Sequence, residues 1–374
     1  MRVMIVVTHL LGTGHLARAL VLGRAFSEAG HSVTVVSGGF PAPQLAIDGV
    51  ALVQLPPLRS DGTNFSRLLG EAGEADKTLF EARIAALLDA LHEVAPDLLI
   101  TELYPFGRRG LRHEFSALLE AASARSPRPV VLASIRDILA PPSRPEKATK
   151  AAEIVTRYYD GVLVHSDPSV TRLDASWPTQ GLEDKLLYTG YVAPARPYPV
   201  QDGTGEILVS AGGGPVGVPI FRAAIEAARK ITNRRWRLLV GGTEAATLIN
   251  MLAPLARDLP VKMEPARPDF RGMLCNAACS VSMCGYNTAL DILQTGVPAV
   301  MVPFDDGKEI EQSLRAESLA HLDAVEVLPT ADLDGDTLAA AVDRAMQGGR
   351  RAASTLQMDG ARRSVEIAER MVGQ

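Results

Sequence analysis

One residue, His15, has the type and position expected of a general base. It is the last residue of the glycine turn of residues 11–15 and directly precedes an expected helix over residues 16–29. The dipole at a helix N-terminus favours the neutral imidazole, which can accept a proton near neutral pH. A histidine that only makes local hydrogen bonds is the alternative.

A carboxylate, Glu102, follows an expected strand over residues 97–101 and is the second candidate for acid–base chemistry. Burial would be needed to raise its pKa towards neutrality, whereas Arg108 and Arg109 nearby would lower the pKa. We therefore expect His15 to be the base and Glu102 to position a substrate, with the two arginines binding an anionic group. Solvated arginines on a surface loop are the alternative.

Further polar groups follow other expected strands. Arg136 and Asp137 come shortly after an expected strand over residues 129–133, and the turn after residues 3–8 contains glycines. In open α/β sheets, groups at the carboxyl ends of the strands line the ligand crevice. Substrate-binding candidates in this part of the chain are Gly12, Thr13, Gly14, Arg108, Arg109, Arg136 and Asp137.

A second candidate site lies in residues 279–316, whose pattern is strand, glycine turn, helix and strand. The helix N-terminus can bind an anion. Asp291, one turn into the helix, could accept hydrogen bonds from a ribose diol. An ordinary βαβ unit with a solvated Asp is the alternative. Candidate ligand-binding residues here are Ser282, Gly285, Tyr286, Asn287, Asp291, Glu311 and Gln312.

Gly212, Gly213 and Gly214 form a glycine loop between an expected strand and helix. Successive N–H groups in such a loop can hold a diphosphate, although no Gly-Lys-Ser/Thr follows, so the loop is not a P-loop. A plain turn is the alternative. The string Gly12-x-Gly14-x-x-Ala17 fits a dinucleotide fingerprint, but residues 37–39 lack the acidic group that holds ribose, so NAD loses most of its support.

Residues 193–205 are rich in Pro and Gly and lack periodicity, so we expect an interdomain linker there. Strands and helices alternate before the linker, in residues 1–192, and again after it, in residues 206–355. This order predicts an α/β protein with two doubly wound domains. We expect residues 58–76 to be a mobile loop with a short helix, and residues 361–371 to form a terminal helix.

Residues 279–316 resemble the donor-nucleotide signature of GT-B glycosyltransferases of family 28, whose best-known member makes lipid II. Ser282, Gly285 and Asp291 fall on the positions that contact nucleotide and ribose, and Glu311–Gln312 falls on a Gln pair that reads the sugar. Two positions depart from the family: Asp replaces a Glu on the ribose, and one Gln of the pair remains. The segments TELYPFGRRG, SIRDIL, YDGVLVHSDPSV and YTGYV resemble a bacterial group of predicted glycosyltransferases of the same superfamily, and that resemblance covers nearly the whole chain.

The resemblance implies a GT-B fold, in which two Rossmann-like domains face each other across a cleft. Residues 1–192 would then bind the acceptor and residues 206–355 the donor, while residues 356–374 would pack back on the first domain. The implied reaction is inverting transfer of a hexose or N-acetylhexosamine from a nucleotide, by analogy UDP, to an acceptor hydroxyl or amine. A sugar-nucleotide hydrolase or epimerase and a non-catalytic nucleotide-sugar sensor stay open as alternatives.

Composition argues against several other classes. The net charge is −5 and aromatic residues make up 5% of the chain, so we expect no nucleic-acid partner. No apolar run is long enough to span a bilayer, and the strand-like residues 3–7 do not suggest a signal peptide, so we expect a cytoplasmic protein. Peripheral membrane contact and the oligomeric state stay open.

No metal set is evident in the sequence, since Asp305–Asp306 alone is weak. The three cysteines lack a neighbouring His and zinc-type spacing, so we expect buried reduced thiols at Cys275, Cys279 and Cys284. We expect the glycine loops and helix N-termini to stabilise a diphosphate without a metal, and we expect no permanently bound cofactor.

Overall fold

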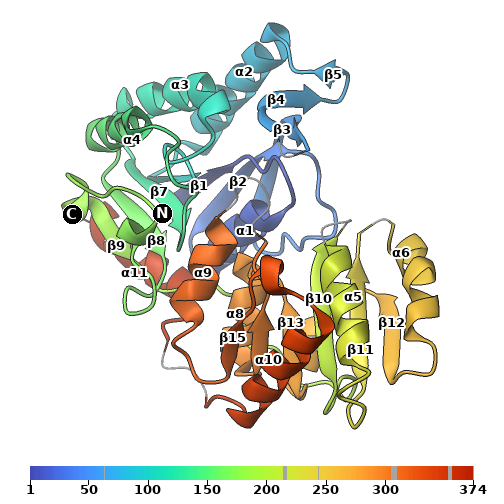
Figure 1. The fold of residues 1–374 in the computed structure, drawn as a ribbon. Coiled ribbons are helices and arrows are strands. Elements are labelled where there is room, and N and C mark those ends of the chain that lie inside the picture. Colours follow the sequence, from blue (N-terminus) through green and yellow to red (C-terminus); the bar gives the residue numbers. More distant parts are fainter. Residues whose placement is uncertain (63, 214–216, 243, 305–309, 353–355, 374) are drawn as a thin grey trace. The chain divides into compact units, whose positions relative to one another are not determined.

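In the computed structural model, which describes residues 1–62, 64–213, 217–242, 244–304, 310–352 and 356–373, the chain forms two compact units (Figure 1). The first unit comprises Met1–Pro194 and Gln357–Gln374, and the second comprises Ala195–Leu356. Each unit has its own sheet. The Pro- and Gly-rich segment 195–205 therefore lies within the second unit, where the amide of Asn276 donates a hydrogen bond to the Val200 carbonyl (3.2 Å).

Among the described residues, the first unit contains a nine-stranded sheet in the order β5-β4-β3-β2-β1-β6-β7-β8-β9. Its strands are β1 (Arg2–Val7), β2 (Ser32–Gly39), β3 (Ala51–Asp61), β4 (Asn64–Gly70), β5 (Gly73–Glu74), β6 (Leu98–Glu102), β7 (Val130–Arg136), β8 (Gly161–His165) and β9 (Leu186–Tyr188). Neighbouring strands are parallel throughout the part of the sheet ordered β3-β2-β1-β6-β7-β8-β9. At one edge, β4 pairs antiparallel with β3, and β5 pairs antiparallel with β4. The strand order reverses between β1 and β6, which makes their carboxyl ends the topological switch point.

The helices of the first unit follow the apolar periodicity of their segments. They are α1 (Gly14–Glu28), α2 (Lys77–Val94), α3 (Arg112–Ser123), α4 (Pro145–Tyr158) and α11 (Gly360–Val372). The carboxylate of Asp76 caps α2 by accepting a hydrogen bond from the Leu79 amide (2.8 Å). The chain's last helix, α11, buries Val365, Ile367 and Ala368 against β1 and α1, so the C-terminal segment completes the core of the first unit.

In the described part of the second unit, a six-stranded parallel sheet has the order β12-β11-β10-β13-β14-β15. Its strands are β10 (Ile207–Gly213), β11 (Trp236–Gly241), β12 (Val261–Pro265), β13 (Cys279–Ser282), β14 (Ala299–Met301) and β15 (Val325–Val327). Its helices are α5 (Val218–Ala227), α6 (Ala245–Leu252), α7 (Phe270–Leu274), α8 (Tyr286–Thr295), α9 (Glu311–Leu319) and α10 (Gly335–Gln347). The order reverses between β10 and β13, so this sheet is doubly wound and has its own switch point.

Two sequence-based expectations about local structure were wrong. Residues 58–76 do not form a loop with a short helix, because β3 continues to Asp61 and β4 and β5 follow. Gly62, at positive φ, lies between β3 and β4, Gly73, also at positive φ, begins β5, and an Asp-Gly pair such as 61–62 is a hairpin signal. Gly212 and Gly213, which we expected in a glycine loop, instead end β10; Gly214 lies outside the described residues.

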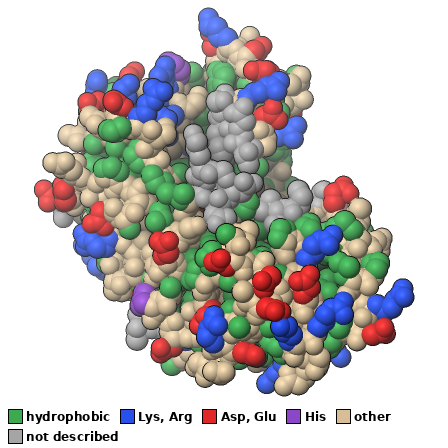
Figure 2. Space-filling model, viewed as in Figure 1, with side chains coloured by type: hydrophobic (Ala, Val, Ile, Leu, Met, Phe, Trp, Pro, Cys, Tyr) green, Lys and Arg blue, Asp and Glu red, His purple; other side chains and the backbone are tan. Residues whose placement is uncertain are grey.

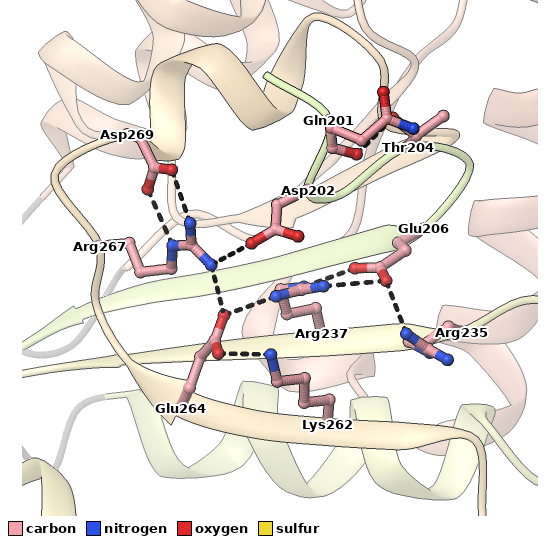
Figure 3. Close-up of polar contacts among 10 residues, drawn as sticks. All are labelled: Gln201, Asp202, Thr204, Glu206, Arg235, Arg237, Lys262, Glu264, Arg267 and Asp269. Atoms are coloured by element: carbon pink, nitrogen blue, oxygen red, sulfur yellow. Dashed lines mark hydrogen bonds and ion pairs between the residues drawn. The ribbon is translucent and has the colours of Figure 1, made fainter. Parts of the chain in front are cut away.

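A network of charged side chains crosses the first strands of the second sheet (Figure 3). Arg237 on β11 is 3% exposed and bridges two carboxylates. Its Nε donates to Glu206 Oε2 at 2.5 Å, and its Nη1 donates to Glu264 Oε1 at 2.8 Å. Arg267, after β12, donates to Asp202 and Asp269. These ion pairs join the segment before β10 to the loop after β12.

On the face in view, described acidic and basic side chains are interspersed (Figure 2). None of the helices in the described ranges combines the length and apolar character needed to cross a bilayer.

Candidate functional site

The first unit brings His15 and Glu102 into contact at its switch point. His15 lies in the first turn of α1, which follows β1, and Glu102 is the last residue of β6. The Nδ1 atom of His15 is 2.8 Å from Oε1 of Glu102. Arg18, one turn further along α1, forms an ion pair with the same carboxylate oxygen. Oε2 of Glu102 accepts a hydrogen bond from the Ser134 hydroxyl (2.7 Å).

The charges around this pair fix the position of the imidazole hydrogen. Burial would raise the pKa of Glu102, but Arg18, His15 and Ser134 together hold the pKa below its usual value, so the carboxylate is ionised and only accepts hydrogen bonds. Nδ1 of His15 also lies 3.2 Å from Nη2 of Arg18, but its shorter contact, 2.8 Å, is with the ionised oxygen of Glu102, so we assign the hydrogen to Nδ1. Nε2 is then the nitrogen that can accept a proton, which is the arrangement of an oriented general base.

Burial also keeps His15 neutral. Desolvation lowers the pKa of His15 to about 3, an effect that Glu102 opposes and Arg108 reinforces. We expected the helix dipole to favour the neutral imidazole, but the larger cause is burial. Glu102 is 1% exposed, and its two oxygens contact His15, Arg18 and Ser134. From these contacts we infer that Glu102 orients His15; its expected role in holding a substrate stays a prediction.

The other candidates in this unit have contacts of their own, and of these Arg108 acts electrostatically on His15. The Nε of Arg108 donates to the Thr8 carbonyl at the end of β1 (2.6 Å), and burial lowers the pKa of Arg108 to about 10. The guanidinium of Arg109 lies over the Trp177 ring, 5.8 Å from its centroid. Gly12, Thr13 and Gly14 lead from β1 into α1, and Gly12 has positive φ. Arg136 ends β7, and Asp137 is 2% exposed and accepts a hydrogen bond from the Ile138 amide.

Buried neutral histidines predict that the protein loses stability in mild acid. Burial lowers the pKa of His165 to about 3 as well, and it lowers the pKa of His9. Below a pH of about 6.5, histidines of the unfolded chain take up protons that the folded chain does not bind. Stability should therefore fall as the pH drops from 6.5 towards 3, by about 1.4 kcal/mol per pH unit for each of His15 and His165, and His9 should add to the fall. Urea unfolding at pH 7.5, 6.5 and 5.5 measures this slope.

The control for this prediction is His165→Gln, which removes one of the three groups. The slope below pH 6.5 should then decrease by about 1.4 kcal/mol per pH unit. An unchanged slope in the variant would mean that His165 is protonated equally in both states.

In the second unit, Ser282 ends β13 and Gly285 precedes α8. Ser282 is fully buried, and its Oγ has no hydrogen-bond partner among the described residues. Tyr286 is buried and Asn287 exposed in the first turn of α8. Gly285 has open space around the position of a Cβ, so the helix N-terminus is accessible from that side.

Asp291 has a protein partner that the sequence did not predict. Its Oδ1 accepts a hydrogen bond from Nε of Arg271 on α7 (2.6 Å), while Nη2 of Arg271 donates to Gln294 (2.7 Å). The side chain of Asp291 is 12% exposed. Burial raises the pKa of Asp291, and the Arg271 charge opposes that rise. Arg271 therefore holds one oxygen of the carboxylate in place.

Glu311 and Gln312 begin α9. The carboxylate of Glu311 accepts a hydrogen bond from Arg315 Nη2 (2.9 Å), and Arg315 Nη1 donates to the Cys284 carbonyl (3.0 Å). The guanidinium of Arg315 lies over the Tyr286 ring, 5.7 Å from its centroid. Oε1 of Gln312 accepts from the Phe304 amide (3.2 Å). Arg315 thus connects the start of α9 with the turn before α8.

Three arginines at these sites were missed by the sequence analysis: Arg18, Arg271 and Arg315. Spacing could have indicated two of them, because Arg18 lies three residues after His15 and Arg315 four residues after Glu311, and such pairs share a helix face. Arg271 meets Asp291 only through tertiary structure. No group of metal-binding side chains is found in the described ranges, and Asp305 and Asp306 lie outside them.

The second unit and the fold define the class of protein. Residues 213–371 match the model of the glycosyltransferase family 28 C-terminal domain, which confirms the resemblance carried by residues 279–316. The whole chain has the fold of GT-B glycosyltransferases, as expected from the sequence: it is similar to MurG from Acinetobacter baumannii, with a TM-score of 0.63, 15% identity and coverage of 99% of this chain and 100% of that one. The class that these comparisons support is glycosyltransferase.

Two further proteins illustrate the range of relatives. The chain is 28% identical to the UDP-N-acetylglucosamine–N-acetylmuramyl-(pentapeptide) pyrophosphoryl-undecaprenol N-acetylglucosamine transferase of Lactiplantibacillus plantarum over 138 residues. This stretch covers 36% of this chain and 38% of that enzyme. The glycosyltransferase VinC, solved in complex with dTDP, has a TM-score of 0.63, 17% identity and full coverage of both chains. The chain thus spans about two fifths of the length of that sequence relative.

Proposed function

We propose that this protein transfers a sugar from a nucleotide donor to the hydroxyl or amine of an acceptor. The observation that carries the proposal is the 2.8 Å contact between His15 and Glu102 at the switch point of the first sheet. Nε2 of His15 takes the proton from the acceptor as its oxygen or nitrogen bonds to the anomeric carbon. The bond from that carbon to the nucleotide diphosphate breaks at the same time, which inverts the anomeric centre.

The donor half of the proposal rests on the second unit. Its match to the family 28 C-terminal domain includes Ser282, Gly285, Asp291, Glu311 and Gln312. We assign Asp291 to the ribose, the N-terminus of α8 to the diphosphate, and Glu311–Gln312 to the sugar hydroxyls. UDP is the nucleotide proposed by analogy with the relative from Lactiplantibacillus, and dTDP is the alternative suggested by VinC.

The acceptor half rests on the candidate groups of the first unit. We assign Arg108, Arg109 and Arg136 to an anionic part of the acceptor, because guanidinium groups bind phosphate and carboxylate in a fixed geometry. Gly12, Thr13 and Gly14 can bring their backbone close to the acceptor, and Asp137 supports that region.

The proposal is tested by measuring nucleotide release from UDP- and dTDP-sugars. Each donor is supplied with and without a panel of hydroxyl and amine acceptors, some of which carry a phosphate or carboxylate. A transferase releases nucleotide at full rate only with an acceptor, and the product contains the sugar. Full-rate release from donor alone would show a hydrolase, and binding without release would show a sensor.

Asp291→Ala should weaken UDP binding by roughly tenfold or more. The carboxylate oxygen not bonded to Arg271 can accept hydrogen bonds from the ribose, and losing a charge-assisted bond costs about 1.5–3 kcal/mol. Calorimetric titration with UDP measures the change. Gln294→Ala is the matched control, because it removes the other side-chain partner of Arg271 and leaves the carboxylate. Equal losses in both variants would assign the effect to Arg271.

Turnover should not require a divalent metal. Helix N-termini such as that of α8 can stabilise the departing diphosphate through backbone N–H groups. Nucleotide release is compared in excess chelator and after addition of Mg²⁺ or Mn²⁺. Equal rates are expected, whereas activity restored only by the metal would contradict this assignment.

A further inference from the structure

A second buried histidine, His165, is connected to Glu102 through hydrogen bonds. His165 ends β8 and is completely buried. Its Nε2 is 2.9 Å from the Ser134 hydroxyl on β7, and the same hydroxyl lies 2.7 Å from Oε2 of Glu102. On the other side of the ring, Nδ1 is 2.9 Å from the Thr189 hydroxyl. A continuous chain therefore runs from Thr189 to His15.

Because the Glu102 carboxylate is ionised, it fixes which group donates and which accepts along this series of hydrogen bonds. Glu102 only accepts, so the single hydrogen of the Ser134 hydroxyl points at Oε2. The Ser134 oxygen must then accept from Nε2–H of His165. Because the ring is neutral, its Nδ1 carries a lone pair, to which the Thr189 hydroxyl can donate at 2.9 Å; the same hydroxyl is also 2.7 Å from the Gly190 carbonyl oxygen. The two histidines consequently hold their hydrogens on opposite nitrogens: Nδ1 in His15 and Nε2 in His165.

We propose that Ser134, His165 and Thr189 are positioning residues that fix Oε2 of Glu102 and thereby hold Oε1 against His15. This inference rests on the proposed function, because it assigns the chain to the orientation of the base. Without Ser134, one oxygen of a buried carboxylate would lose its partner and the carboxylate could rotate. The Nε2 lone pair of His15 would then no longer be held in one direction.

The position of these hydrogen-bonded residues distinguishes them from an ordinary polar cluster of the core. Glu102 and Ser134 are register partners on β6 and β7, and His165 lies at the carboxyl end of the next strand, β8. All three are therefore at the sheet edge where ligands bind in open α/β folds. The charges that act on His165 are Arg18 and Glu102, which also act on His15.

The first arm of the test needs no substrate. ¹⁵N-edited NMR of the histidine side chains reports which ring nitrogen carries the hydrogen. At pH 7 the protein should show His15 with Nδ1–H and His165 with Nε2–H, identified by loss of the signal in His15→Gln and His165→Gln. In Ser134→Ala, His15 should become a mixture of the two tautomers. The same tautomer on both histidines, or an unchanged His15 in Ser134→Ala, would overturn the inference.

The second arm measures turnover. Ser134→Ala and His165→Leu should lower kcat by about 10- to 100-fold, the cost of a small misplacement of a catalytic group, and leave the donor KM unchanged. His165→Gln, which keeps an N–H donor, should recover part of the rate. Ser37→Ala is the matched control, because Ser37 is buried on β2 and its Oγ has no hydrogen-bond partner among the described residues.

The outcomes distinguish this inference from the proposed function. If the wild-type protein turns over and Ser134→Ala matches Ser37→Ala, the chain does not position the base and the inference is wrong. If the wild-type protein turns over no nucleotide sugar, the proposed function is wrong. The NMR measurement still shows whether the hydrogen bonds between His165 and His15 form as inferred. Thr189→Val provides a second variant if His165→Leu does not fold.

Discussion

Replacing His15 with alanine should lower turnover by about 10²–10⁴-fold, the usual contribution of a general base. UDP affinity should stay nearly unchanged, because the proposed donor residues lie in the second unit. The physical reason is the contact with Glu102, which leaves Nε2 of His15 as the proton acceptor. Initial rates with a working acceptor and calorimetric titration with UDP measure the two quantities.

The control for His15→Ala is Glu102→Gln, which keeps the size of the side chain and removes its charge. An oriented base predicts a smaller loss for Glu102→Gln than for His15→Ala, since the imidazole remains. If Glu102→Ala showed the full loss and His15→Ala did not, the roles of base and orienting group would have to be exchanged.

Arg237→Ala should destabilise the protein by about 3–5 kcal/mol, the cost of removing one partner from a buried ion pair. Arg237 is 3% exposed, and its removal leaves Glu206, which is 7% exposed, without the two hydrogen bonds it accepts from this side chain (Figure 3). Those hydrogen bonds also raise the pKa of Arg237. Urea unfolding followed by circular dichroism measures the loss.

Arg235→Ala is the matched control, because the Arg235 side chain pairs with the same Glu206 but is 63% exposed. A surface pair of this kind contributes about 0–1 kcal/mol. Equal and small losses in the two variants would show that the network does not stabilise the second unit.

The sequence predicted the site of the first unit through strand ends. His15 follows β1, and Glu102 is the last residue of β6. The two residues are 87 positions apart in the sequence, yet β1 and β6 are adjacent in the sheet, with Val6 paired to Thr101. A parallel sheet places both carboxyl ends at one edge, which is why each residue could be singled out separately. Their direct contact depends on the reversal of strand order between β1 and β6, which no local pattern reveals.

Side-chain partners were harder to predict than positions. Arg271 reaches Asp291 from a different helix, and Ser134 was not distinguished from other small polar residues at strand ends. Such contacts are set by packing rather than by periodicity. The error at residues 58–76 has another cause: the glycines and polar residues there suit a loop and a hairpin equally, and pairing with β3 decides between them.

Helix capping depends on local geometry. Asp334 forms a capping box with Thr337 at the start of α10. Capping needs only a few consecutive residues, so the sequence contains most of the information about it.

The central claim is that the first unit supplies the base and the second unit binds the donor. Its most direct test is the dependence of nucleotide release on donor concentration in the wild type, His15→Ala and Asp291→Ala, at saturating acceptor. The account predicts that His15→Ala lowers kcat at an unchanged donor KM, whereas Asp291→Ala raises the donor KM. Wild-type kcat in His15→Ala, or an unchanged donor KM in Asp291→Ala, would contradict it.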